Sequence, residues 1–334
     1  MYRIDVKKAL NETDYEEWER LWLEAGNPKI YNSTYWFKAC CTVFNRKYFA
    51  VYIYKDEVLK SIIPLRSLWN LIYISPGGKY LDKSSNLFRT ADPDGLEYLI
   101  NEYFRTKCFI FSEVPDSELM YYGNSKYQRI SSVNPFARID SELTSISKRT
   151  RKKLDKILVE NEGAFSLAVY KDNVKENIHT VFDIEQKSNK IERKRALFSN
   201  EKIRQFFADI SRYPDTRLFV LYFNNIPIAH TLDFMNDHIL TGCHTAYLEE
   251  YKALMPGKLL TFFVMNYCKD NGIEIYDFSR GECDKKAQFA KEKSNNFSLY
   301  YGNSLFIFSI RCYFKMISIL KSIKRKLRKW KIIQ

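Results

Sequence analysis

The segment from His244 to Ala290 constrains the fold more than any other part of the chain. It joins an apolar strand edge, a Pro256–Gly257 turn, an apolar helical stretch over 258–270 and a second strand that ends in Asp-Phe-Ser-Arg-Gly. A Pro-Gly pair directly before a helix permits a tight turn, so free N–H groups of the first helical turn face a loop that carries Lys258. This arrangement predicts an anion site of the size of a diphosphate. Strand, loop, helix and strand, in this order, are typical of nucleotide-binding α/β folds.

A simpler interpretation of the same segment is a buried helix between two strands, in which the Pro-Gly pair only ends one element and begins the next. The charged end of the second strand favours the interpretation of this segment as a binding site. Asp277 and Arg280 flank Phe278 and Ser279 and are followed by Gly281, which places opposite charges at a sheet edge. Open α/β folds bind their ligands at such an edge.

These residues resemble those of a known family. The GNAT-superfamily acyltransferases of the cellulose-biosynthesis (CelD-like) and FemAB-like branch carry a Ser-Pro-Gly-x-Leu-Leu loop, then Asp-Phe-x-Arg-Gly, then a Tyr-Lys pair. The chain is similar in 255–260, 277–281 and 285–286, although Met255 stands in place of the serine and no tyrosine precedes Lys286. The resemblance extends upstream to 147–153 and to 185–198, and so covers about residues 140–300.

The resemblance implies an α/β protein of two tandem GNAT-like units. We expect an N-terminal unit over 1–140, a second unit over 141–303 with the acyl-CoA site, and a basic amphipathic tail over 304–334. Two expected hairpins align without gaps, 50–56 over 219–225, which is a weak internal repeat. Acetyl-CoA or another acyl-CoA would be the donor, held at Met255, Pro256, Gly257, Lys258 and Leu259.

Local patterns predict the individual elements. Helices are expected at 15–24 after a Thr13 cap, from 32–33 onward, and at 97–105, 145–161, 174–187, 200–210 and 258–270. Strands are expected at 48–54, 58–65, 108–111, 164–170, 218–223, 226–234 and 273–278.

Composition excludes several classes of protein. Of the 334 residues, 46% are hydrophobic and 16% aromatic, too many for a disordered chain. The seven cysteines are odd in number and lack paired spacing, so neither a disulfide framework nor a zinc site is predicted and no metal is expected. The first residues lack the apolar run of a signal peptide, so we expect a cytoplasmic protein.

Acyl transfer needs a group that takes the proton of the acceptor, and four side chains are candidates. His244, on the strand that leads into the Pro-Gly loop, has an ordinary pKa suited to general base catalysis. A lone strand histidine also commonly has only a structural hydrogen bond. Glu185, Tyr247 and Asp277 are the other candidates, and a solvated helix face explains Glu185 equally well. By analogy with GNAT enzymes, backbone N–H groups in 241–246 would stabilise the oxyanion. Gly242 in this stretch is typical either of a close approach between backbone segments or of a turn.

Acceptor binding is assigned to Arg280, Lys286 and Arg193. The Arg280 guanidinium can bind a carboxylate or phosphate through two hydrogen bonds, or pair with Asp277 as a structural bridge. Lys286 and Arg193 follow from the family resemblance. That branch works on surface glycans, so the favoured acceptor is an amino or hydroxyl group of a sugar or lipid-linked glycan precursor. The alternatives are a Fem-type transferase that uses aminoacyl-tRNA, with phosphate contacts from the basic stretch 148–156, and a non-catalytic partner of a membrane-bound synthase.

The positive charge is concentrated in the tail. Nine lysines and arginines and no acid lie between Arg311 and Gln334, which is most of the net charge of +13. The apolar residues of 304–320 are interrupted by Arg311 and Lys315, so they predict a helix that packs on the body or lies flat on a surface. We expect peripheral binding to the anionic inner face of the cytoplasmic membrane, and a tail docked on the body is the alternative.

Overall fold

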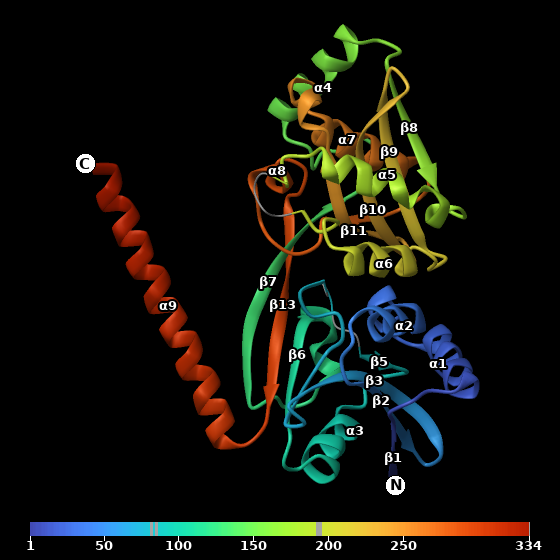
Figure 1. The fold of residues 1–334 in the computed structure, drawn as a ribbon, viewed down its shortest axis with the longest axis vertical. Coiled ribbons are helices and arrows are strands. Elements are labelled where there is room, and N and C mark those ends of the chain that lie inside the picture. Colours follow the sequence, from blue (N-terminus) through green and yellow to red (C-terminus); the bar gives the residue numbers. More distant parts are fainter. Residues whose placement is uncertain (81–82, 84–85, 192–195, 334) are drawn as a thin grey trace.

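The computed structural model describes residues 1–80, 83, 86–191 and 196–333. Its centre is a 13-stranded mixed sheet in the order β1-β2-β3-β4-β6-β13-β7-β12-β11-β10-β9-β8, with β5 paired to β3 outside this path. Two halves lie one above the other and helices cover the sheet in both (Figure 1).

The two halves repeat one order of elements. In the first half these are β1 (Tyr2–Lys7), α1 (Glu12–Glu24), α2 (Thr34–Val43), β2 (Tyr48–Lys55), β3 (Val58–Leu68), β4 (Ile72–Ile74), β5 (Leu87–Phe88), α3 (Pro93–Tyr98) and β6 (Cys108–Pro115). In the second half they are α4 (Lys148–Glu160), β8 (Phe165–Tyr170), α5 (Val174–Gln186), α6 (Glu201–Ile210), β9 (Thr216–Phe223), β10 (Ile226–Asn236), β11 (Ile239–Tyr247), α7 (Pro256–Asp270) and β12 (Ile275–Asp277). Apart from the additional β5 and α4, each half has one strand, two helices, three antiparallel strands, a helix and a strand.

The hairpin turns of the two halves also agree. Asp56 and Glu57 have positive φ between β2 and β3, and Asn224 and Asn225 have positive φ between β9 and β10. Two central residues with positive φ are the signature of a type I′ turn, which matches the twist of the strands that it joins. The predicted pair of GNAT-like units is confirmed in this fold, and the aligned hairpins occupy equivalent places.

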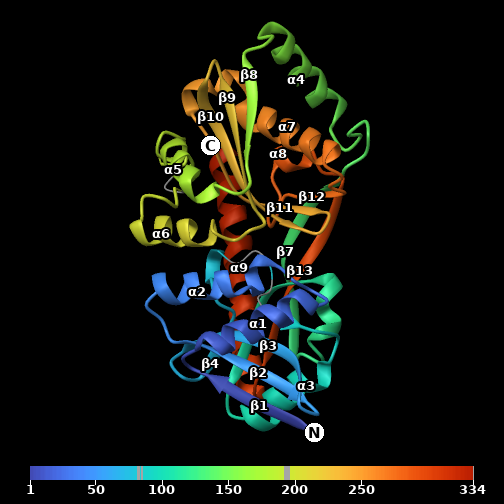
Figure 2. The same cartoon turned by 90° about the vertical axis from the view of Figure 1, so that its right-hand side faces the viewer.

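Two long strands connect the halves. β7 (Tyr127–Arg138) and β13 (Glu292–Tyr301) pair antiparallel, and both run along the molecule between the halves (Figures 1 and 2). β13 pairs with β6 in the first half, whereas the end of β7 pairs with β12 in the second. Each half therefore includes a strand from the other part of the chain. The boundary at residue 140 stays a prediction.

The halves share a core. Trp36 of α2 packs edge-on against Phe206 of α6, with 5.0 Å between ring centroids, and Tyr31 packs in the same way against Phe234 of β10 at 6.2 Å. Both contacts belong to one buried cluster that also contains apolar residues of α5. Burial of these aromatic side chains between the two units stabilises their relative position.

Local predictions were accurate where one pattern decides the element. The predicted helix over 174–187 is α5. The helix predicted over 258–270 is α7, but it begins at Pro256, so the Pro-Gly pair forms the first turn of the helix and not a turn before it. The predicted cap of the first helix was wrong, because Asn11 and Asp14 form a reciprocal capping box and α1 begins before Thr13. β1, β7 and β13 were not predicted.

The chain ends in a long helix, α9 (Ser304–Ile333), which leaves the body after β13 and extends beside it as a separate rod (Figure 1). Its first turns contact β7 and β13. Phe314 lies 6.0 Å from Tyr300, and the guanidinium of Arg129 lies 3.9 Å from the Phe314 ring. No helix in the described part of the chain is long and apolar enough to span a bilayer.

Candidate active site

A cavity of about 430 Å³ opens where two parallel strands separate. β11 pairs with β12 only at Ile239, Leu240 and Thr241. Beyond Thr241 it continues to Tyr247 with β10 as its partner, while β12 ends at Asp277. The cavity wall consists of residues around this gap: Tyr80, Lys190, Leu197, Phe207, Thr231, Gly242, Cys243, His244, Thr245, Leu260, Thr261, Tyr276, Phe278, Ser279, Arg280, Cys283, Lys285, Lys286 and Phe289.

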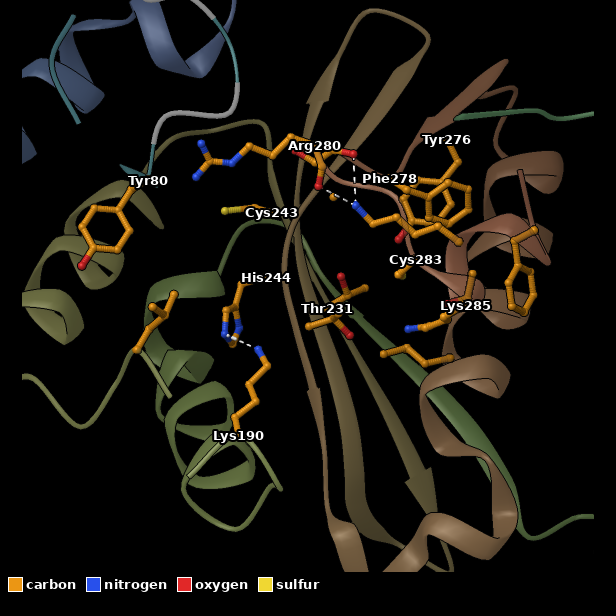
Figure 3. Close-up of a pocket in the computed structure, with 18 of the residues that line it drawn as sticks. Tyr80, Lys190, Thr231, Cys243, His244, Tyr276, Phe278, Arg280, Cys283 and Lys285 are labelled. Carbon is orange, nitrogen blue, oxygen red and sulfur yellow. Dashed lines mark hydrogen bonds between the residues drawn. The ribbon is translucent and has the colours of Figure 1, made fainter. Parts of the chain in front are cut away.

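The cavity has walls on both faces of the sheet. Leu260 and Thr261 come from α7, whereas Phe207 comes from α6 and Leu197 from the segment before it, and these helices lie on opposite sides of the sheet (Figure 2). Lys190 and Lys285 likewise lie on opposite sides of the cavity (Figure 3). Tyr80 is contributed by the first half. A narrow ligand that passes between β11 and β12 would therefore contact both faces at once.

A β-bulge shapes the gap. The pairing of β10 with β11 shifts between Leu232 and Asp233, so Cys243 is the extra residue opposite them. Gly242 lies beside a buried contact in which Tyr276 donates a hydrogen bond to Asp233 over 3.0 Å. A Cβ on Gly242 would lie 3.9 Å from the Tyr276 hydroxyl and 3.8 Å from the Asp233 carboxylate. These are ordinary van der Waals distances, so the contact between Tyr276 and Asp233 does not require a glycine at 242.

Asp233 is fully buried, and burial raises the pKa of its carboxyl to about 7 in spite of hydrogen bonds from Thr231 and Tyr276. The group contacts the backbone of the bulged Cys243. Asp233 therefore holds the bulge in place.

The opposite wall contains a buried charged network. His244 Nε2 lies 2.7 Å from Glu185 Oε1 and 2.9 Å from Lys190 Nζ. The second oxygen of Glu185 accepts the backbone N–H groups of Leu197 at 2.9 Å and Phe198 at 2.7 Å. Lys190 Nζ lies 3.6 Å from Glu185 Oε1. Two of the predicted catalytic residues are therefore in direct contact at the cavity.

The protonation of this network follows from its geometry. Burial raises the pKa of the Glu185 carboxyl, but the hydrogen bonds from His244 and Phe198 and the charge of Lys190 outweigh burial, and the pKa is lowered overall. Burial and the charge of Lys190 lower the pKa of His244 to about 4, although Glu185 acts in the opposite direction. The imidazole is thus neutral at pH 7.

A neutral imidazole has one N–H, and we assign it to Nε2. A lone pair on Nε2 would face the Glu185 carboxylate at 2.7 Å, whereas an N–H there makes a charge-assisted hydrogen bond. With the N–H on Nε2, Lys190 makes no hydrogen bond to the imidazole and pairs instead with Glu185 Oε1 at 3.6 Å. The basic nitrogen is then Nδ1, which is buried and has no hydrogen-bond partner among the described residues. A neutral histidine oriented by a carboxylate is the arrangement of a general base.

The predicted anion site lies at the start of α7. Met255 has φ 50 and ψ 47 and turns the chain into Pro256, the first residue of the helix. A Cβ on Gly257 would lie 3.3 Å from the Tyr247 ring and 3.4 Å from Lys285 Nζ. A side chain at 257 would therefore press on the Tyr247 ring, and a larger one would displace Lys285 as well. Burial lowers the pKa of Lys285 to about 8.

A second cavity, of about 360 Å³, adjoins the helix start and is lined by Ser147, Arg149, Thr150, Lys153, Lys258 and Gln288. Burial first, and then the charges of Lys153 and Arg149, lower the pKa of Lys258. Three cations are thus gathered between the N-termini of α4 and α7, where both helix dipoles also favour an anion.

The loop after β12 forms the rim of the cavity. Arg280 Nη1 lies 4.0 Å from Glu113 Oε1 of β6. Lys286 donates to the backbone oxygens of Ser279 at 3.1 Å and Arg280 at 2.8 Å, so it holds this loop. Asp277 lies outside the cavity wall and accepts a hydrogen bond from Lys83 of the first half at 2.5 Å.

The remaining predicted residues have other positions. Leu259 is fully buried in the core, Met255 packs against that core, and Tyr247 lies beside Gly257. Arg193 falls outside the described residues. The catalytic and binding roles of the predicted residues stay predictions.

Sequence reasoning missed Lys190, Lys285 and Lys83. The signal for Lys285 was present in the Lys285–Lys286 pair, but a helix of four residues, α8 (Asp284–Ala287), gives no pattern that decides which lysine faces inward.

Comparison with known proteins agrees with this geometry. Residues 145–287 match the sequence profile of the family described as Acetyltransferase (GNAT) domain. This match covers less than half of the chain, and residues 145–287 are similar to a GNAT-type acetyltransferase domain. No curated protein matches the chain significantly.

The whole fold is similar to solved structures of low sequence identity. FemX aligns with a TM-score of 0.60 and 12% identity over 92% of this chain and 99% of that chain. The C-terminal domain of a putative lysylphosphatidylglycerol synthetase from Agrobacterium fabrum aligns with a TM-score of 0.60 and 9% sequence identity. The alignment covers 89% of this chain and 94% of that chain. L-PGS from Bacillus licheniformis aligns with a TM-score of 0.58 and 12% sequence identity. The alignment covers 88% of this chain and 94% of that chain. These values support a shared GNAT-like fold, and the predicted CelD-like branch stays a prediction.

Proposed function

We propose that this protein transfers an acyl group, in the simplest case acetyl, from acyl-CoA to an amino or hydroxyl group. One observation carries the proposal: a single cavity is lined by Leu260 and Thr261 of α7, one turn after Gly257, on one face of the sheet and by His244, which contacts Glu185, on the other. A donor bound between β11 and β12 would place its thioester between these two groups.

The residues at the start of α7 fit the donor. The helix N-terminus favours a diphosphate, Gly257 leaves space for close approach, and Arg149, Lys153 and Lys258 supply positive charge for further phosphate. Acyl-CoA supplies the activated thioester when it is bound. No cluster of metal-ligating side chains occurs in the described part of the chain.

The Glu185–His244 pair would move the proton. Nδ1 of His244 accepts it from the attacking amine or hydroxyl group, while Glu185 stabilises the imidazolium that forms. The depressed pKa of His244 keeps the imidazole in the basic form at neutral pH. Backbone N–H groups of the bulge at Gly242–Cys243 are the candidates for stabilising the oxyanion.

The second candidate is a Fem-type transferase that takes its acyl group from aminoacyl-tRNA. The likeness to FemX and the basic helix α4, which has six lysines and arginines among its 13 residues, favour it. A third candidate, a non-catalytic partner of a polysaccharide synthase, gives no reason for a buried Glu185–His244 pair at a cavity.

Calorimetric titration with acetyl-CoA and with aminoacyl-tRNA separates the candidates. We expect saturable binding of acetyl-CoA, and release of free CoA once an acceptor is added. Binding of aminoacyl-tRNA together with no binding of acetyl-CoA would replace the first proposal by the second. Binding of neither ligand would favour the non-catalytic role.

We also propose that α9 attaches the enzyme to an anionic membrane surface, at the inner face of the cytoplasmic membrane, where a lipid-linked sugar or glycan precursor would be the acceptor. The helix has an exposed stripe at helical spacing: Leu305, Phe308, Cys312, Met316, Ile319 and Ile323. Nine cations and no acid follow from Arg311 onward. Each cation near an anionic bilayer contributes about 1 kcal/mol at low salt.

Liposome flotation tests the attachment. The full chain should float with anionic vesicles, be released by high salt, and remain behind with neutral vesicles. A chain that ends at Asn303 and a Phe308→Glu, Met316→Glu variant should both lose flotation. Equal flotation of all three proteins would exclude α9 as the anchor.

A further inference from the structure

The first half has large apolar side chains that are exposed to solvent near the start of β6. Trp69 is 83% exposed, Leu71 58% and Tyr103 50%. Trp69 and Leu71 belong to the tip of the β3–β4 hairpin, and Tyr103 ends the helical segment Leu99–Tyr103 that precedes β6. Large exposed apolar side chains that lie together mark a surface that contacts another surface.

The sheet brings these residues to one end of the first half. β4 pairs with β3 at the hairpin and with the start of β6 on its other side. Lys107 Nζ donates a hydrogen bond to the backbone oxygen of Asn70 over 2.7 Å, and the Cys108 N–H donates to that of Leu71 over 3.0 Å. The hairpin tip and the segment that contains Tyr103 therefore form one surface.

A basic groove of about 960 Å³ adjoins the hairpin tip. Among the described residues, no carboxylate lines this groove, and four cations do: Lys8, Arg46, Lys47 and Lys107. The aromatic residues Tyr48, Phe49, Tyr73, Tyr103 and Phe104 also line it. Lys8, Arg46 and Lys47 are exposed and form no ion pair with a described carboxylate. Cations gathered in this way attract a negatively charged surface.

The backbone at the hairpin tip is unfavourable for a tryptophan. Trp69 has φ 52 and Asn70 has φ 57, and the Leu71 N–H donates to the backbone oxygen of Leu68 over 3.1 Å. Positive φ at both central positions is typical of a type I′ turn, which favours asparagine and glycine there. A bulky aromatic residue in this conformation is strained, and its exposed side chain gains little from packing. Stability of the fold therefore does not explain Trp69.

We propose that this end of the first half is a second membrane contact, in which Trp69 and Leu71 enter the headgroup region of an anionic bilayer and the cations of the basic groove contact lipid phosphates. Tryptophan and tyrosine favour the membrane interface, because each combines an apolar ring with a hydrogen-bonding group. α9 begins beside the same surface, since Lys107 lines a further cavity together with Asn303, the residue before this helix. The inference rests on the membrane attachment proposed above, adds a contact of the folded body to it, and is independent of the acyl transfer.

Tryptophan fluorescence tests the contact in the full chain. The chain has five tryptophans, and replacing Trp330 by phenylalanine removes the one in α9. Of the others, Trp18 and Trp36 are buried and Trp22 is partly buried, so Trp69 is the tryptophan that a lipid can reach. The probe is a vesicle of equal parts phosphatidylglycerol and phosphatidylcholine with brominated acyl chains, since bromine quenches tryptophan at short range. We expect quenching relative to the same vesicles without bromine, and none with phosphatidylcholine alone. Adding Trp69→Phe should abolish the difference.

These measurements separate the new contact from the α9 anchor. Flotation of the Trp330→Phe protein without bromine-dependent quenching would leave α9 as the anchor and refute the contact at Trp69. Failure of the wild-type chain to float with anionic vesicles would refute both contacts. Neither result bears on acetyl-CoA binding, which calorimetry measures separately.

Charge variants test the groove. Arg46→Gln combined with Lys47→Gln should weaken partitioning into the anionic vesicles by about tenfold, because both cations face the bilayer. Lys175→Gln combined with Lys202→Gln removes the same charge from exposed positions on α5 and α6 and should leave partitioning unchanged. Equal partitioning of the two double variants would refute the role of the groove. Binding of a single-stranded oligonucleotide that depends on Arg46 and Lys47, with no effect of these residues on vesicles, would assign the groove to nucleic acid instead.

Trp69→Gly separates membrane binding from a structural role. Glycine adopts positive φ freely, so the melting temperature should be unchanged or higher while partitioning into anionic vesicles weakens. A lower melting temperature with unchanged partitioning would show that Trp69 serves the fold, and would overturn the proposal.

Discussion

Burial and then the charge of Lys190 lower the pKa of His244, so Lys190→Met should raise the pKa of the imidazole. Lys190 Nζ lies 2.9 Å from His244 Nε2. At an effective dielectric constant of about 20, two unit charges at this distance repel by about 6 kcal/mol, which is an upper limit. Glu185, 3.6 Å from Lys190, cancels part of the repulsion. We expect a rise of at least about one pKa unit from the value of about 4, or about 1.4 kcal/mol.

Histidine NMR measures this shift without knowledge of the acceptor. The chain has four histidines, His179, His230, His238 and His244, and single His→Gln variants assign their signals. The His244 signal should titrate near pH 4 in wild type and at higher pH in Lys190→Met. Because the basic form is the active one, the acid limb of kcat/KM should move upward by the same amount. A wild-type pKa near 6.5, or no shift in Lys190→Met, would refute the assigned network.

Three further results are expected. Glu185→Gln should lower the pKa of His244, opposite to the effect of Lys190→Met, and should lower kcat by about 10²-fold or more, since the imidazolium loses its counter-charge. Normal turnover in this variant would exclude the Glu185–His244 pair as the general base. The pKa of His244 in the folded protein lies below the ordinary 6.5, so the unfolded chain binds more protons than the folded chain between pH 4 and 6.5. The free energy of unfolding should therefore fall by up to about 3 kcal/mol as the pH drops through this window. Chemical denaturation should show a weaker pH dependence of this free energy in His244→Gln. Lys83→Met should lower the free energy of unfolding by about 3 kcal/mol, because it leaves the buried Asp277 carboxylate without its ion-pair partner. A second change, Asp277→Asn, should restore part of this stability. An unchanged melting temperature in Lys83→Met would show that the ion pair between the halves does not stabilise the fold.

The parts of the fold that the sequence predicts well are those set by local chemistry. The turn at Asn224 and Asn225 and the apolar runs of β9 and β10 both depend on neighbouring residues. β7 and β13 were missed because their partners are distant in sequence: Phe297 pairs with both Val114 and Ile130.

The same distinction holds at the site. Glu185 and His244 were each candidates on chemical grounds, but they are 59 residues apart and only the fold brings them within 2.7 Å. Lys190 has no sequence pattern that marks it, because it lies after α5 and enters the site through a loop. The left-handed backbone of Met255 was also unexpected, since a methionine has no intrinsic preference for positive φ.

A crystal structure with bound CoA tests the central claim most directly. The account predicts the diphosphate at the N-terminus of α7 next to Gly257, the thiol between β11 and β12 in the cavity that His244 lines, and loss of this binding in a folded Gly257→Val protein. CoA bound away from α7, or with its thiol outside the gap between β11 and β12, would contradict it.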